Sequence, residues 1–168
     1  MFFINYLFII WDLWGEIMIT ITKEFSWDMS HMLAEHEGLC KNLHGHTYRM
    51  EVTVAKKEGA LEDEGSKAGM VIDFKDLKKI VKEEIVEPLD HSFMYWTHSP
   101  DEIEHQIARI LQQDERKVFA VDFRPTAEMM SIYFFQSLED RFNGIDINLV
   151  SIKVWETPTS YAEFRGER

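Results

Sequence analysis

The sequence predicts an α+β domain, in which an antiparallel sheet carries helices on one face. Two early stretches have the pattern of β-strands: residues 18–27 alternate apolar with polar side chains, and residues 46–57 are rich in β-branched and aromatic side chains. Apolar residues at helical spacing then follow Asp73, Ser99 and Thr126, and a long alternating strand covers residues 148–156. This order of strands and helices indicates the α+β class.

The bulk composition is that of one soluble globular domain. The chain has 168 residues, of which 45% are apolar and 29% are charged. A formal net charge of −12 argues against a nucleic-acid or anionic-membrane partner. The single cysteine excludes an internal disulfide, which fits a cytoplasmic protein.

Residues 1–17 form an apolar segment that we interpret as an extension outside the fold, so that the domain covers residues 18–168. The segment has no basic start and no small-residue cleavage site, unlike a signal peptide. Asn5 and Asp12 interrupt its apolar run, which is shorter than the about 20 residues that a membrane span needs. Translation starting at Met18 would explain the segment, and a membrane or partner anchor is the alternative.

The first two strands are expected to pair across a long loop, and residues 58–69, with glycines and mixed charges, read as a turn or hairpin tip. Asp73 is placed to cap a helix that ends before Pro88. The inward residues of that helix are Phe74, Leu77, Val81 and Ile85. Its lysines lie off this stripe and read as a solvated face.

The second half of the chain alternates helices with extended segments. Ser99 and Glu102 form a capping box for a helix with Ile103, Ile107, Ile110 and Leu111 inward. Residues 117–123 read as a short edge strand. Thr126 caps a helix that runs to about Phe142 and ends at Gly144, and residues 161–165 form a final edge. The inward residues of the Thr126 helix are Met130, Tyr133, Phe134 and Leu138.

Residues 31–46 hold four of the seven histidines and the cysteine. His44 and His46 stand two apart at the start of a strand, so their imidazoles face the same side. With His31 or His36 as a third ligand, they would form a three-imidazole site with one open position, which is typical of catalytic zinc. The alternative is a pair of ordinary surface or core histidines.

Cys40 lies four residues before His44, and three readings of it stay open. It could be a fourth ligand that closes the zinc site. It could be a reactive thiol that acts as base or nucleophile beside an open site. It could also be an inert buried cysteine.

Three acidic or paired groups have both a structural and a functional reading. Asp90 and His91 follow a helix, where such a pair is commonly a cap or a satisfied polar contact. Glu128 falls in a first helical turn, where the helix dipole stabilises an acid. Glu156 ends an apolar row with Val154, so it either reaches water at the strand end or needs a partner with paired N–H donors, such as a guanidine-like edge.

Five blocks of this sequence together resemble the 6-pyruvoyl-tetrahydropterin synthase / 6-carboxytetrahydropterin synthase family, in the order of that family, over roughly residues 18–166. They are Phe25-Ser-Trp-Asp-Met-Ser-His31, Cys40-Lys-Asn-Leu-His44-Gly-His46, Leu89-Asp90-His91, Pro125-Thr126-Ala-Glu128 and Trp155-Glu156-Thr-Pro-Thr-Ser-Tyr-Ala-Glu163. The resemblance implies the tunnelling fold, with subunits joined through their sheets, commonly as hexamers. The segment 95–117 looks longer than in compact members of the family.

The resemblance also implies roles for individual residues. His31, His44 and His46 match the zinc ligands, and Cys40 matches the catalytic thiol that accepts a proton. Asp90 and His91 match a proton-relay pair that is contributed across a subunit boundary. Glu156 matches the acid that anchors the pterin and is sometimes counted in the relay, while Thr126 and Glu128 fall in a motif near the pterin.

The three-residue gap between Cys40 and His44 resembles the 6-carboxytetrahydropterin synthase branch of queuosine biosynthesis. The implied activity is that of a carbon-carbon lyase, which converts 7,8-dihydroneopterin triphosphate to 6-carboxy-5,6,7,8-tetrahydropterin, acetaldehyde and triphosphate. The alternatives are 6-pyruvoyltetrahydropterin synthase and a non-catalytic zinc-binding module. A triphosphate in a protein of net charge −12 needs local cations, for which Lys41, Arg49 and the helix lysines are candidates.

Overall fold

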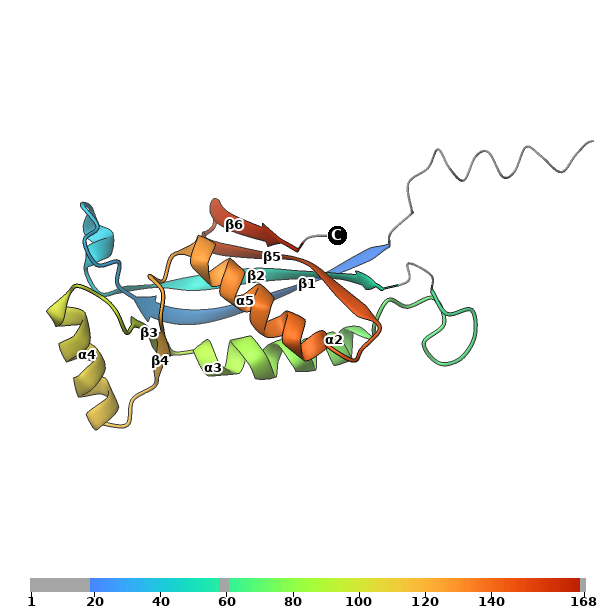
Figure 1. Cartoon of the computed structure of the whole chain (residues 1–168), viewed down its shortest axis with the longest axis horizontal. Helices are drawn as coiled ribbons and strands as arrows, with labels where there is room; N and C mark the ends of the chain where they lie inside the picture. Colours follow the sequence, from blue (N-terminus) through green and yellow to red (C-terminus); the bar gives the residue numbers. More distant parts are fainter. Residues whose placement is uncertain (1–18, 58–60, 167–168) are drawn as a thin grey trace, which may run out of the picture.

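The structure, a computed structural model, describes residues 19–57 and 61–166. Its centre is a six-stranded sheet with the order β4-β3-β1-β2-β5-β6 (Figure 1). The strands are β1 (Thr20–His31), β2 (His44–Lys56), β3 (Ser92–Trp96), β4 (Val118–Val121), β5 (Ile147–Thr157) and β6 (Ser160–Arg165). The segment 1–17, expected to lie outside the fold, falls outside the described residues.

Four of these strands form the antiparallel sheet that the sequence predicts. β1 pairs with β2 along its whole length, from Thr20 opposite Ala55 to His31 opposite His44. β2 pairs with β5, and β5 pairs with β6, also antiparallel. The long loop between β1 and β2 contains one short 3-10 helix, η1 (Leu39–Lys41).

The predicted antiparallel sheet is confirmed for these four strands, but the whole sheet is mixed. β3, which the sequence analysis missed, runs parallel to β1, and β4 runs parallel to β3. A helical segment precedes each of these two strands. Such a connection lets the next strand run parallel to its neighbour in the sheet. The aromatic run from Ser92 to Trp96 carries the β-propensity that could have identified β3.

The first helical region is longer than predicted and passes over Pro88. α2 (Phe74–Val81) begins at Asp73, whose side chain accepts from the Lys75 N–H at 2.7 Å, as expected. The chain then widens into a π-helix, η2 (Lys82–Val86), and continues as α3 (Glu87–Leu89). We attribute the continuation to the π turn, which relieves the clash that proline causes in a regular α-helix. Leu77, Val81 and Ile85 are buried as predicted, whereas Phe74 is exposed.

The prediction for the next helix, α4 (Glu102–Gln113), is wrong in its start and right for only two of the four inward residues. Ile107 and Leu111 are partly buried against a small core cluster, as predicted. Asp101 rather than Ser99 is the N-cap and accepts from the Ile103 N–H at 2.9 Å. Ile103 and Ile110 are 60% and 64% exposed, whereas Glu104 and Ala108 are buried. The Glu104 carboxylate accepts from the backbone N–H of Trp96 at 3.0 Å, which holds this face of α4 against β3.

The last helix, α5 (Ala127–Phe142), follows the prediction closely. Thr126 caps it by accepting from the Met129 N–H at 3.4 Å, and Gly144 follows with φ +85°. Met130, Phe134 and Leu138 are buried, whereas Tyr133 is only partly buried. α5 and the α2–α3 region lie on the same face of the sheet, where their apolar side chains pack on Trp27, Met50, Ile152 and Val154. None of the described helices combines the length and apolarity that crossing a membrane requires.

The opposite face of the four antiparallel strands is polar. Glu24, Asp28 and Thr47 point to this side, as the alternation of exposed with buried residues along β1 and β2 shows. Arg49 stacks over Trp155 on the same side at 4.1 Å from the ring centroid. The sheet therefore has one face packed against helices and one face of charged and polar side chains.

Candidate metal centre and active site

Strand register brings together the side chains of His31, His44 and His46. His31 is the last residue of β1 and lies opposite His44, the first residue of β2. His46 follows two residues later on the same, core-facing side of β2. One ligand nitrogen from each ring lies within 4.8 Å of the other two, and this is a spacing that a metal ion could bridge.

Hydrogen bonds orient two of the three rings. Nδ1 of His31 lies 2.8 Å from the carbonyl oxygen of Pro125, and Nδ1 of His44 lies 2.8 Å from that of Asn42. Since a carbonyl oxygen only accepts, each Nδ1 carries the proton and leaves Nε2 with a free lone pair. Nε2 of His44 and Nε2 of His46 are buried and have no hydrogen-bond partner among the described residues. Such unpaired, converging lone pairs fit a bound cation.

The protonation of these rings also suits a metal ligand. Burial, opposed by the Pro125 hydrogen bond and reinforced by the neighbouring His44 and His46, lowers the pKa of His31 from 6.5 to about 4. Burial also lowers the pKa of His46, although Glu156 acts in the opposite direction. Both rings are therefore neutral near pH 7, and a neutral imidazole is the form that binds metal.

Between His31 and His36, the structure favours His31 as the third member of the cluster. The Nδ1 atom of His36 instead accepts a local hydrogen bond from the Gly38 N–H at 2.9 Å. Cys40 also does not belong to the histidine cluster within the part of the chain that the structure describes. This geometry counts against a fourth-ligand role for the thiol.

Cys40 lies in η1, half-buried, in the loop that connects the two histidine-bearing strands. Its carbonyl oxygen accepts from the Leu33 N–H at 2.9 Å, which closes the loop. Tyr48 lies two residues after His46 on the same side of β2, and its hydroxyl is 3.2 Å from Nε2 of His31. Burial, then Glu156, then Cys40 raise the pKa of Tyr48, so the thiol and the carboxylate both lie near this hydroxyl.

Glu156 lies beside the cluster rather than free in solvent. Its Oε1 is 3.6 Å from Nε2 of His31 and 4.0 Å from Nε2 of His46. Its side chain is 29% exposed, because it also forms part of the wall of a cavity of about 290 Å³. Thr126 and Glu128, at the start of α5, line the same cavity. Three residues of the predicted substrate site thus share one hollow next to the histidines.

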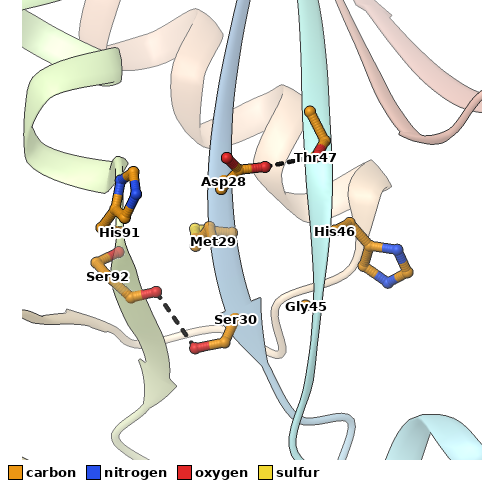
Figure 2. A pocket seen from close by; sticks show the side chains of 8 residues that line it. All are labelled: Asp28, Met29, Ser30, Gly45, His46, Thr47, His91 and Ser92. Atoms are coloured by element: carbon orange, nitrogen blue, oxygen red, sulfur yellow. Dashed lines mark hydrogen bonds between the residues drawn. The ribbon is translucent and has the colours of Figure 1, made fainter.

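The Asp90–His91 pair is formed, but away from the cluster within one chain. His91 has φ +61°, and this turn brings its Nδ1 to 3.0 Å from Oδ1 of Asp90. Partial burial raises the pKa of Asp90, but the Asp28 N–H, His91 and Lys117 outweigh it and hold that pKa below its usual value. Among the described residues Asp90 accepts hydrogen bonds from Asp28 and Lys117, and the pair has none with the His31–His44–His46 cluster. Figure 2 shows His91 beside β3 and His46 beyond β2, with β1 between them.

The sequence analysis missed two residues of this region. Tyr48 continues the period of two that His44 and His46 begin, and this alternation was the signal for it. Arg124 precedes the Pro125-Thr126 motif and lines the same cavity as Glu156. No periodicity marks Arg124, since it lies in the irregular segment between β4 and α5.

Comparisons with known proteins agree with this arrangement. Residues 20–167 match the family model of 6-pyruvoyl tetrahydropterin synthase. The chain belongs to this family. It is therefore an enzyme of the pterin synthase family.

Two similar relatives carry the name of one enzyme. The chain is 46% identical to the 6-carboxy-5,6,7,8-tetrahydropterin synthase of Haemophilus influenzae over 148 residues, which are 88% of this chain and 99% of that protein. It is 35% identical to the protein of the same name from Aquifex aeolicus, over 76% of each chain.

Solved structures confirm the fold. A protein of Wolinella succinogenes superimposes with a TM-score of 0.73 at 24% identity, covering 90% of this chain and 99% of that one. The 6-pyruvoyl tetrahydropterin synthase of Plasmodium vivax gives 0.66 at 19% identity, again over 90% and 99%. The predicted tunnelling-type α+β fold is confirmed, with the correction that the sheet is mixed.

Proposed function

We propose that this member of the family is a zinc-dependent 6-carboxy-5,6,7,8-tetrahydropterin synthase. Its substrate would be 7,8-dihydroneopterin triphosphate, and its products 6-carboxy-5,6,7,8-tetrahydropterin, acetaldehyde and triphosphate, in the queuosine pathway. The observation that carries the proposal is the 46% identity to a synthase of that name over nearly its whole length. The three convergent histidines beside Glu156 supply matching chemistry.

The residues of the chain divide the work as follows. His31, His44 and His46 would hold the zinc ion, which when bound supplies Lewis acidity toward a substrate oxygen. Glu156 accepts hydrogen bonds from the paired N–H groups of the pterin ring. Thr126 and Glu128, at the start of α5, lie at the border of the ring. Cys40, on the loop above the cluster, takes the proton from the substrate side chain. Asp90 orients His91 through Nδ1, so that Nε2 can return a proton to the ring.

We propose that the Asp90–His91 pair acts at the active site of a neighbouring subunit. We therefore propose a homo-oligomer, as a hexamer, whose active sites lie at subunit boundaries. The polar sheet face and the position of His91, with β1 between it and His46, support this arrangement. The cytoplasm, where the single cysteine stays reduced, is the expected compartment.

The direct test incubates the purified, zinc-loaded protein with 7,8-dihydroneopterin triphosphate and identifies the products by mass. The carboxy product with stoichiometric acetaldehyde supports the proposal. A pyruvoyl product without acetaldehyde would instead assign 6-pyruvoyltetrahydropterin synthase, the name of the matching family model. No pterin product at all would overturn the enzymatic assignment.

A Cys40→Ala variant separates catalysis from a purely structural zinc module. Loss of turnover with zinc retained is expected, because the thiol lies outside the histidine cluster of the described residues. Loss of zinc together with the fold would support the structural module. A Leu39→Ala variant, adjacent in the same loop and 83% exposed, is the matched control and should keep both zinc and turnover.

A further inference from the structure

The cavity beside the histidine cluster contains two opposite charges that do not neutralise each other. Arg124 and Glu156 both line this hollow of about 290 Å³. No ion pair joins Arg124 to any carboxylate in the described part of the chain, so its nitrogens lie more than 4.0 Å from Glu156. Opposite charges that share a small cavity without meeting leave room between them for a guest with both donors and acceptors.

The guanidinium of Arg124 has unused hydrogen-bonding capacity. Its Nη2 donates to the carbonyl oxygen of Ala34 at 2.9 Å, which fixes the plane of the group. Its Nε is buried and has no partner among residues 19–57 and 61–166. A partly buried cation with one neutral acceptor is costly unless a further acceptor arrives.

The shape of a pterin edge matches this pair of charges. The 2-amino group and N3–H of the ring donate, and the adjacent 4-oxo group accepts. A carboxylate suits the two donors, whereas a guanidinium suits a carbonyl oxygen. Both charged groups line the same cavity, which is the placement that contact with two edges of one ring requires.

We propose that Arg124 is a specificity-determining residue that donates a hydrogen bond to the 4-oxo group of the pterin while Glu156 binds the 2-amino side. This inference rests on the proposed function, because it names how that same site recognises its substrate. Arg124 thereby selects a 2-amino-4-oxo ring over a 2,4-diamino ring, since an amino group at position 4 would place a donor against a donor. The bond to Ala34 also ties the specificity residue to the loop that carries Cys40.

Three ligands test the proposal by equilibrium binding to the zinc-loaded full chain at about pH 8: neopterin, its 4-amino-4-deoxo analogue and its 2-deamino-2-oxo analogue. The wild type is expected to prefer neopterin over the 4-amino analogue by about 10- to 100-fold, the loss that one unpaired charged hydrogen bond causes. Arg124→Met should abolish that preference and keep the preference over the 2-oxo analogue. Glu156→Gln should do the reverse. Arg116→Met, an exposed arginine paired with Asp114, is the matched control and should behave as wild type.

Several results would overturn the proposal. If Arg124→Met lowers the affinity for all three ligands equally, Arg124 only positions the loop through its hydrogen bond to Ala34. If the variant keeps the 4-oxo preference, another group reads that position. Should Arg124→Met fail to fold, Arg124→Lys, which keeps the charge, takes its place in the binding test. Absence of the 4-oxo preference in the wild type itself also refutes the proposal. A wild type that turns over the substrate without discriminating refutes only this inference, whereas one that neither binds nor turns over a pterin refutes the proposed function.

Discussion

His31 is fully buried at the end of β1, and its two ring nitrogens have different surroundings. Nδ1 is fixed by the Pro125 carbonyl, and Nε2 faces Tyr48, Glu156 and the other two imidazoles. The Pro125 bond comes from the segment just before α5, so the element that carries Thr126 and Glu128 also orients a ligand of the cluster. The proposed metal site and the proposed substrate site are thus connected through this single carbonyl.

The lowered pKa of His31 makes the stability of the metal-free protein depend on pH. The unfolded chain binds a proton on this residue below about pH 6.5, whereas the folded chain binds it only near pH 4. Stability is therefore expected to fall as the pH drops through this window, by up to about 3 kcal/mol from this residue. Urea unfolding of metal-free wild type and His31→Gln, measured from pH 7 to pH 4, checks this. A parallel pH dependence of the two proteins would contradict it.

At the scale of single residues, the sequence identified the chemistry but not all of the partners. The spacing of His44 and His46 predicts their common face from strand geometry alone. The choice of His31 over His36 came from the family resemblance, because the periodicity of a sequence does not predict the path of a loop. Tyr48 and Arg124 were missed, since their importance comes from contacts with residues distant in sequence.

Among the elements, β2 passes close to β1 at Gly45, between two of the clustered histidines. A Cβ at this position would lie 3.0 Å from the carbonyl oxygen of Met29 on β1. Gly45→Ala is thus expected to push the strands apart by a few tenths of an ångström and to weaken zinc affinity by about 10- to 100-fold. Competition with a chelating dye measures this, with Ser26→Ala on the exposed side of β1 as control. Unchanged affinity in Gly45→Ala would show that the strand tolerates the shift.

The helix α4 depends on one buried acid. Glu104 is completely buried and accepts from the Trp96 N–H, so it joins α4 to the end of β3. Glu104→Ala is expected to destabilise the protein by about 2 kcal/mol, because a buried backbone donor loses its partner. Equilibrium unfolding in urea compares it with Glu102→Ala, a neighbour whose side chain is 68% exposed. Equal stability of the two variants would remove this anchoring role.

Elements with strong local signals were predicted well, and those that depend on tertiary contacts were not. Asp73 and Thr126 cap the predicted helices, and α5 ends beside Gly144 as expected. The predicted inward face of α4 was right for Ile107 and Leu111 but wrong for Ile103 and Ile110, because the buried Glu104 satisfies a backbone group of another element. β3 and its parallel pairing were missed, because pairing direction depends on how the intervening helix returns the chain.

At the scale of the whole molecule, the open polar face of the sheet and the separated Asp90–His91 pair lead to a subunit-mixing prediction. Cys40→Ala and His91→Ala should each be inactive alone. Refolding them together should restore roughly a quarter of the wild-type turnover, because some sites then combine an intact thiol with an intact imidazole from a neighbour. Steady-state turnover of the mixture measures this. Cys40→Ala refolded alone by the same procedure is the control. No recovery in a mixed oligomer would mean that each chain completes its own site.

The cross-strand placement of the histidines has a practical consequence. His31 and His44 form a directly opposed pair, and His46 lies two positions along, so a slip of one residue between β1 and β2 would scatter the ligands. Retention of the proposed zinc ion would thereby report correct strand alignment. Screening a variant library for resistance to a chelator would enrich chains with native pairing before any substrate is in hand.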